Sequence, residues 1–215
     1  MDVHVRTGVE LAANLIDIQG TWQREGRILD GGDWEEPSEV LWLQVGRHFC
    51  DLRTVRTGAE AACVLDQVQS FSGTVQVKEG AISFHHDLDS LDRDPAHPDQ
   101  GTVHRVGNAM LERGPGFEER WMMASLPGDE TSVLELVEPD TGGVVARVVR
   151  IGSSALAVVG GPAGGGVLWR SHEDWTMTRS TMAEPDHVDA ALALRALDAG
   201  TALPPGWRVL ESEEL

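Results

Sequence analysis

Residues 16–24 read Ile16-Asp17-Ile18-Gln19-Gly20-Thr21-Trp22-Gln23-Arg24, and apolar and polar side chains alternate along this stretch. Successive side chains of a β-strand point to opposite faces, so a period of two is typical of a strand with one buried face. We therefore predict that residues 16–24 form the first confident strand of the fold.

Short segments of the same kind follow this strand as far as residue 180, and turns separate them. Residues 40–45 form a more continuous apolar run, and residues 73–78 and 81–87 are predicted to pair as a hairpin around Glu79-Gly80. We count about ten such segments, and no helical pattern lies between them to support a βαβ unit. The pattern therefore indicates an all-β fold, either a sandwich or a closed barrel.

The last part of the chain has a different pattern. Pro185-Asp186 precedes a run in which apolar residues recur at helical spacing, and Gly200 follows that run. A start signal, an apolar stripe and a glycine stop are typical of a helix. We predict a C-terminal α-helix over about residues 187–199.

The Gly20-Thr21-Trp22 triplet resembles the Gly-x-Trp signature of lipocalins and other calycins. In that family the tryptophan plugs the closed end of the barrel, and an arginine from the last strand packs on it. The resemblance implies the plug role for Trp22. It leaves Arg170 and Arg179 as the two candidates for the arginine.

A longer series of motifs is similar to a lipocalin-like family known from a fungal casein-kinase-interacting protein and its bacterial relatives. The series runs through residues 20–24, 41–44, 51–53, 82–89 and 118–121. This resemblance implies one domain over residues 1–215, a lipocalin-like antiparallel β-barrel of about residues 15–180 with the C-terminal α-helix after it. The family brings no established chemistry. The Thr-Asp-Tyr motif of extracellular lipocalins is absent, which argues against an extracellular carrier.

Charge and composition narrow the partners and the compartment. The chain carries 17 Lys and Arg against 35 Asp and Glu, a formal net charge of −18. Such a chain lacks the basic face that nucleic acid or an anionic membrane surface requires, so we predict neither as a partner. Two cysteines, Cys50 and Cys63, are too few for a disulfide framework. The first 18 residues lack a compact apolar signal core, and we expect a cytoplasmic protein.

One candidate acid–base pair lies on the strand predicted at residues 81–87. Alternation places His85 and Asp87 on the same face. A carboxylate beside an imidazole holds its tautomer and raises its basicity, so the pair could transfer protons near neutral pH. The same two residues would also suit a solvated strand end, and the orientation of this strand is open.

Two glutamates are further catalytic candidates. Glu112 shares a strand face with Met110, and Glu119 shares one with Trp121 and Met123. A glutamate that faces an apolar lumen has a raised pKa and can act as a general acid. Either residue could instead lie on the surface.

The candidate ligand-binding residues are three tryptophans and an arginine. Trp42, Trp121 and Trp169 are expected to form an aromatic lining. Arg53 could hold a substrate carboxylate with its planar guanidinium group, or form a structural pair with Asp51. His48, His85 and His104 lie on three different strands but show no metal-ligand spacing, so we predict no metal and no cofactor.

Three functions remain open from these residues. We favour a cofactor-independent acid–base enzyme of the lyase, hydratase, isomerase or cyclase type, which acts on a small hydrophobic molecule inside the barrel. The alternative is a non-catalytic intracellular binding protein for such a ligand. The third is an interaction module whose acidic surface binds a basic protein. An exposed strand edge or the apolar stripe of the helix would allow a homodimer, although nothing in the sequence requires one.

Overall fold

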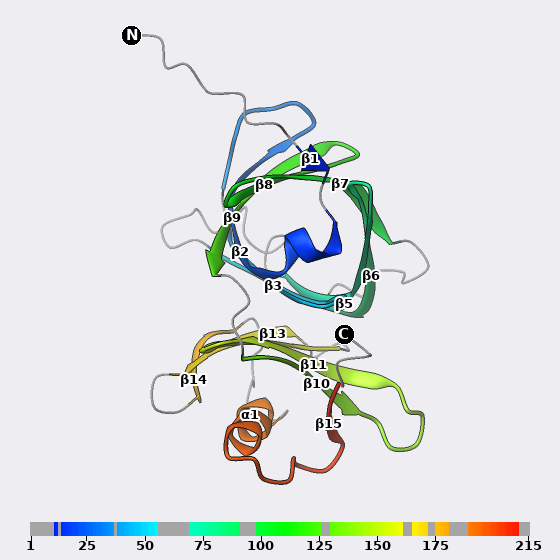
Figure 1. Ribbon diagram of the computed structural model, residues 1–215, viewed down its shortest axis with the longest axis vertical. Coiled ribbons are helices and arrows are strands. Elements are labelled where there is room, and N and C mark those ends of the chain that lie inside the picture. Colours follow the sequence, from blue (N-terminus) through cyan, green and yellow to red (C-terminus); the bar gives the residue numbers. More distant parts are fainter. Residues whose placement is uncertain are drawn as a thin grey trace.

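The computed structural model describes residues 11–12, 14–36, 38–55, 69–90, 98–125, 130–160, 165–171, 175–180 and 189–210. These residues form two antiparallel β-sheets and one α-helix, stacked in layers (Figure 1). In chain order the elements are β1 (Leu11–Ala12), the 3₁₀ turn η1 (Leu15–Ile18), β2 (Gly20–Leu29), β3 (Ser38–Val45), β4 (His48–Val55), β5 (Gln69–Lys78), β6 (Ala81–Asp89), β7 (Asp99–Val106), β8 (Ala109–Gly114), β9 (Phe117–Ser125), β10 (Thr131–Val137), β11 (Val144–Ile151), β12 (Ser154–Val159), β13 (Gly165–Ser171), β14 (Trp175–Ser180), α1 (Ala190–Asp198) and β15 (Trp207–Val209).

The first sheet closes on itself as an eight-stranded antiparallel barrel. Strands β2 to β6 pair in chain order with their neighbours, β6 pairs with β7, β7 with β8, β8 with β9, and β9 returns to β2. The short strand β1 is added along β7. The predicted hairpin is confirmed, since β5 and β6 pair across Glu79 and Gly80, both with positive φ. The structure therefore confirms the all-β class and the closed barrel.

One end of the barrel is closed by η1 and Trp22. The indole N–H of Trp22 donates to the carbonyl of Ile18 at 2.7 Å, and both side chains are fully buried. The prediction that the first strand begins at Ile16 is wrong, because residues 15–18 form a 3₁₀ turn that enters the barrel (Figure 1). The strand begins at Gly20, where φ is +124°.

The arginine on Trp22 comes from an unexpected strand. The guanidinium of Arg105, on β7, lies 5.6 Å from the Trp22 ring centroid and donates to the carbonyl of Asp17 at 2.6 Å. The expectation of Arg170 or Arg179 is wrong, since both belong to the second sheet. The reason is topological, because the barrel ends before either residue is reached.

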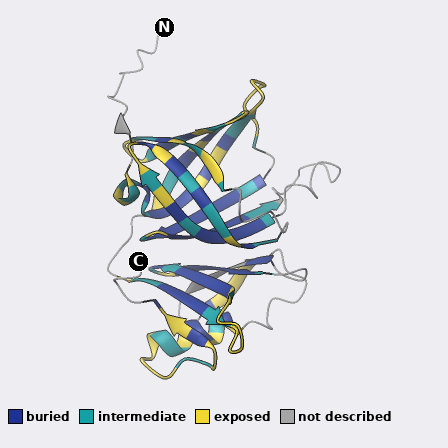
Figure 2. Cartoon of the chain, turned by 90° about the vertical axis from the view of Figure 1, so that its right-hand side faces the viewer, coloured by how far each residue is buried: buried dark blue, intermediate teal, exposed yellow. Residues whose placement is uncertain are grey.

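The second sheet has the order β14-β13-β12-β11-β10-β15 and lies against the outside of the barrel. The prediction that the barrel extends to about residue 180 is therefore wrong, since its last strand ends at Ser125. The two sheets share one apolar core (Figure 2). Its barrel members include Leu41, Leu43 and Leu52, and its second-sheet members include Leu156 and Val158. Residues 40–45 read as a continuous apolar run because this strand is buried on both faces.

The interface requires a very close approach at one point. A Cβ on Gly166 of β13 would lie 2.6 Å from a methyl carbon of Leu52 and 2.8 Å from the Cβ of Ser70. Only a residue without a side chain fits between the two sheets there. Part of the glycine-rich stretch at residues 160–166 therefore belongs to a packed strand rather than to a turn.

The helix α1 packs on the far face of the second sheet and does not close the barrel (Figure 1). Its buried Ala190, Ala193 and Leu194 contact Leu134, Trp175 and other residues of that face. The predicted helix is confirmed over residues 190–198, and residues 187 and 188 lie outside the described part. No helix among the described residues is long and apolar enough to cross a bilayer. The assignment of one domain to residues 1–215 stays a prediction.

Candidate functional site

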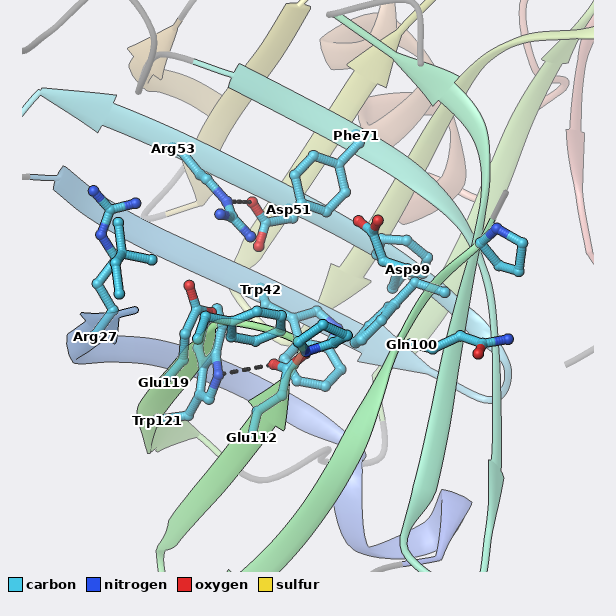
Figure 3. A pocket seen from close by; sticks show the side chains of 16 residues that line it. Arg27, Trp42, Asp51, Arg53, Phe71, Asp99, Gln100, Glu112, Glu119 and Trp121 are labelled. Carbon is cyan, nitrogen blue, oxygen red and sulfur yellow. Dashed lines mark hydrogen bonds and ion pairs between the residues drawn. The ribbon is translucent and has the colours of Figure 1, made fainter. Parts of the chain in front are cut away.

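The barrel encloses a cavity of about 570 Å³ (Figure 3), and Trp22 is not among the residues that line it. This volume lies in the range of about 300–1,000 Å³ that is usual for small-molecule sites. The lining combines aromatic and charged side chains. It consists of Arg27, Leu29, Trp42, Phe49, Asp51, Arg53, Phe71, Phe84, Pro98, Asp99, Gln100, Glu112, Pro115, Phe117, Glu119 and Trp121.

Aromatic rings meet edge to face in the floor and walls of this cavity. The ring centroid of Trp42 lies 5.5 Å from those of Trp121 and Phe84, and the interplanar angles are 77° and 70°. Phe49 makes a similar contact with Phe84 at 5.3 Å. Rings held in this way present both faces and edges to the cavity, and they stay rigid because each is packed against the next.

Three buried or half-buried arginines surround the cavity, and each is already paired. Arg53 donates to Asp51 at 2.9 Å, and Arg27 lies 2.8 Å from Glu35. Arg24, which is 1% exposed, bridges Glu36 at 2.8 Å and Glu119 at 2.5 Å. Arg24 was not among the residues predicted from the sequence. It could have been found, because it lies two residues after Trp22 and alternation places both side chains on the interior face.

Glu112 differs from the other carboxylates of the cavity. Its Oε2 accepts a hydrogen bond of 3.1 Å from the indole N–H of Trp121 (Figure 3), and no ion pair to Glu112 is found in the described part of the chain. It lies directly across from Glu119 in the β8–β9 pair. Burial, then the negative charge of Glu119, raise the pKa of Glu112 to about 8. A buried glutamate of this kind is protonated at neutral pH.

The Asp51–Arg53 pair lies on the wall next to Glu112 and Glu119. Burial raises the pKa of the Asp51 carboxyl, although the positive charge of Arg53 opposes that shift. Burial would lower the pKa of Arg53, but the charges of Asp51 and Glu119 reverse the effect and raise it. The guanidinium also stacks over Phe71, with Cζ 4.9 Å from the ring centroid. The structure thus places Trp42, Arg53, Glu112, Glu119 and Trp121 around one cavity.

His85 and Asp87 do not belong to this site. Gly73 pairs with His86 and Ser72 pairs with Leu88, which leaves Asp87 as an extra residue, a β-bulge. Asp87 lies on the outside of the barrel, where it forms an ion pair of 2.8 Å with Arg147 of the second sheet. His85 alternates with the inward Phe84, so it also faces away from the cavity. The sequence left the orientation of this strand open, and the structure turns both residues away from Glu112 and Glu119.

A different histidine lies behind the cavity wall. The ring of His86 stacks on Phe71 at 4.6 Å and 8°, and its Nδ1 lies 3.0 Å from the Asp89 carboxylate. Its Nε2 lies 3.4 Å from Asp99, which lines the cavity. Alternation places His86 on the same strand face as Phe84 and opposite to His85, so His86 could have been predicted to lie near the cavity. The bulge that brings Asp89 beside it has no such signal.

The remaining sequence candidates lie elsewhere. Trp169 is part of β13 in the second sheet, away from the barrel strands that carry the cavity, and its side chain lies outside the described part. Cys50 is buried between the sheets, and burial raises the pKa of its thiol to about 11, which makes it a poor nucleophile. Cys63 lies outside the described residues. No cluster of metal-ligating side chains occurs among those that are described.

The fold has a counterpart among solved structures. The chain is similar to the crystal structure of an uncharacterised protein from Saccharomyces cerevisiae, with a TM-score of 0.64 and 16% sequence identity. The alignment covers 89% of this chain and 97% of the yeast chain. No family model and no curated protein sequence matches the chain. At this identity the likeness shows the shared fold, a closed antiparallel β-barrel with the elements that follow it.

Proposed function

We propose that this protein is a cofactor-independent acid–base enzyme that acts on a small, largely apolar molecule bound in the barrel cavity. The carrying observation is the cross-strand pair of Glu112 and Glu119. Glu112 has no ion-pair partner among the described residues and favours its protonated form, whereas Glu119 is in an ion pair with Arg24. A carboxyl group that favours its protonated form, beside one that is in an ion pair with a guanidinium group, supplies an acid and a base side by side.

The roles follow from these contacts. Glu112 donates a proton to the bound molecule, and Glu119 accepts one. Trp121 fixes the position of the Glu112 carboxyl through its indole N–H. The aromatic walls hold the apolar body of the molecule and keep water away, which strengthens the effect of each charge. A reaction of the lyase, hydratase or isomerase type needs no more than such a pair.

We further propose that the chain is a relative of the lipocalin-like family known from a fungal casein-kinase-interacting protein. The similar fold of the uncharacterised yeast protein supports this relationship. The Trp22 and Arg105 stack at the closed end supports it as well, since it corresponds to the plug expected from the Gly-x-Trp signature.

A proton-transfer assay tests the enzymatic proposal without knowledge of the natural substrate. The protein is incubated in D₂O with a panel of small apolar ketones and alkenols, and mass spectrometry records deuterium uptake, isomers and hydrates. We expect turnover of at least one compound. Glu112→Gln and Glu119→Gln should each lower that rate by about 100-fold or more. Glu118→Gln is the matched control, because Glu118 faces outward beside Arg113.

The outcomes separate the two functions. Conversion that is lost in both cavity variants and kept in Glu118→Gln supports the enzyme. Compounds that quench tryptophan fluorescence but are recovered unaltered, with no deuterium uptake, would overturn it in favour of a binding protein.

A further inference from the structure

We propose that the cavity selects a small apolar amine, an organic cation, over neutral and anionic molecules of the same shape. This inference rests on the proposed function for the claim that the cavity binds a small molecule, and it adds the chemical class of that molecule. Three observations carry it: the balance of charge in the lining, the pairing of the guanidinium groups that the structure describes around it, and the arrangement of the aromatic rings.

The charge balance of the lining is negative. Apart from Glu112, which favours its neutral form, the lining has three carboxyl groups, on Asp51, Asp99 and Glu119, but two guanidinium groups, on Arg27 and Arg53. Behind them, Arg24 is accompanied by Glu36 and Arg27 by Glu35. An anion that enters the cavity meets an excess of like charge. A cation is attracted, beginning with Asp99, whose side chain is 55% exposed.

The described guanidinium groups around the cavity already have carboxylate partners, which reduces their attraction for a ligand carboxylate. Arg24 is held by two glutamates, Arg27 by Glu35 and Arg53 by Asp51. An anionic ligand would have to share a guanidinium group with its present carboxylate, which repels the ligand, or displace that carboxylate from its partner. Of the two roles that the sequence allowed for Arg53, we therefore favour the structural pair with Asp51 over the binding of a substrate carboxylate.

The aromatic walls suit a cation. Trp42, Trp121 and Phe84 line the cavity with Trp42 at steep angles to the other two rings, so their faces point in different directions. An ammonium group is attracted to such faces, and tryptophan is the strongest partner. The wall already holds one cation in this way, since the Arg53 guanidinium lies over Phe71.

Glu112 is the group that an amine would meet. Its carboxyl is 6% exposed, lines the cavity and lacks an ion-pair partner in the described part of the chain. A neutral amine takes the proton of Glu112: the O–H bond breaks, an N–H bond forms, and an ammonium–carboxylate pair results. An amine that is already protonated forms the same pair and the Glu112 proton passes to the buffer, so that the ammonium group then carries the proton for the proposed reaction.

The test compares three probes of one shape: 2-phenylethylamine, 2-phenylethanol and phenylacetate. Isothermal titration calorimetry at pH 7, in two buffers of different ionisation enthalpy, gives both affinity and proton release. We expect the amine to bind at least about tenfold more tightly than the alcohol, and phenylacetate to bind most weakly. Binding of the amine should release about 0.9 of a proton from the protein. A group with a pKa of about 8 carries about 0.9 of a proton at pH 7, and Glu112 loses it when the ammonium group binds.

Two variants locate the effect. Glu112→Gln should abolish the proton release and reduce the preference for the amine, whereas Glu118→Gln should change neither. If the alcohol binds as tightly as the amine, or phenylacetate binds best, the amine class is overturned while the D₂O assay still decides the proposed function. Failure of all three probes to bind at millimolar concentration, or binding of the amine without proton release, overturns the inference as well.

Discussion

Two clusters of polar and charged side chains in this protein differ in how their buried carboxyl groups are paired. The cavity cluster consists of Asp51, Arg53, Glu112 and Glu119, and the interface cluster, between the two sheets, consists of Ser72, Asp87, Glu135, Arg147 and Arg208. In the interface cluster, Arg147 lies 2.7 Å from Glu135 and 2.8 Å from Asp87, and Arg208 lies 2.6 Å from Glu135.

The pKa directions follow from this difference in partners. Burial alone would raise the pKa of Glu135, but its hydrogen bonds from Arg208 and Arg147 lower it. Glu112 is also buried but accepts its hydrogen bond from a neutral indole, and its pKa rises to about 8. Burial therefore does not decide whether a carboxylate is structural or reactive. A guanidinium partner stabilises the charge of Glu135, and the lack of one in the described part of the chain leaves Glu112 ready to exchange a proton.

The largest expected effect comes from breaking the interface cluster. Arg147→Met removes the cation that joins Glu135 of the second sheet to Asp87 of the barrel, and we expect the free energy of unfolding to fall by about 4 kcal/mol. Urea denaturation measures it. Arg120→Met is the control, because the pair of Arg120 with Glu25 is exposed and should contribute less than about 1 kcal/mol. Equal losses in the two variants would show that the interface cluster does not hold the sheets together.

A smaller and pH-dependent effect is expected in the cavity cluster. Between about pH 5 and pH 8, Glu112 is protonated in the folded protein but ionised in the unfolded chain, so the folded protein binds the extra proton and stability falls as the pH rises. Glu112→Gln lacks this ionisation. Relative to the wild type, its free energy of unfolding should gain about 2 kcal/mol between pH 6 and pH 8. Urea denaturation at several pH values measures the gain, and a difference that does not change with pH would contradict the assignment.

The smallest effect is expected for His85, which belongs to neither cluster. His85→Gln should change the free energy of unfolding by less than about 0.5 kcal/mol, because the side chain faces away from the cavity. Affinity for 2-phenylethylamine should stay within about twofold of the wild type, as calorimetry can show. A tenfold loss of affinity would mean that the β6 strand faces the cavity differently from the structure described above.

The residues of the cavity could largely be predicted from strand alternation. Glu112 and Glu119 lie on a regular hairpin, so a period of two places both on the inner face together with Trp121. Leu88 and Asp89 could not be placed in this way. One extra residue at Asp87 shifts every later side chain of β6 to the other face, and the bulge depends on Gly73 of the neighbouring strand, where a Cβ would lie 1.8 Å from the carbonyl oxygen of His85.

The division into two sheets could not be predicted either. Residues 131–180 alternate as barrel strands do, and alternation does not say which sheet a strand joins. The continuous apolar run at residues 40–45 was the available signal, because a barrel strand with both faces buried needs a second layer outside the barrel. Arg105 and Trp22 lie on β7 and β2, which do not pair with each other, and they meet only because the barrel is closed, which no local pattern predicts.

The ionisation of Glu112 is the measurement that tests the account most directly. Protein labelled with ¹³C at the glutamate side-chain carboxyl carbons is titrated by NMR, and the Glu112 signal is identified by its absence in Glu112→Gln. We predict a midpoint of about 8 for this carboxyl. A midpoint near the ordinary value of 4.5 would contradict both the proton-donor role and the selection of an amine.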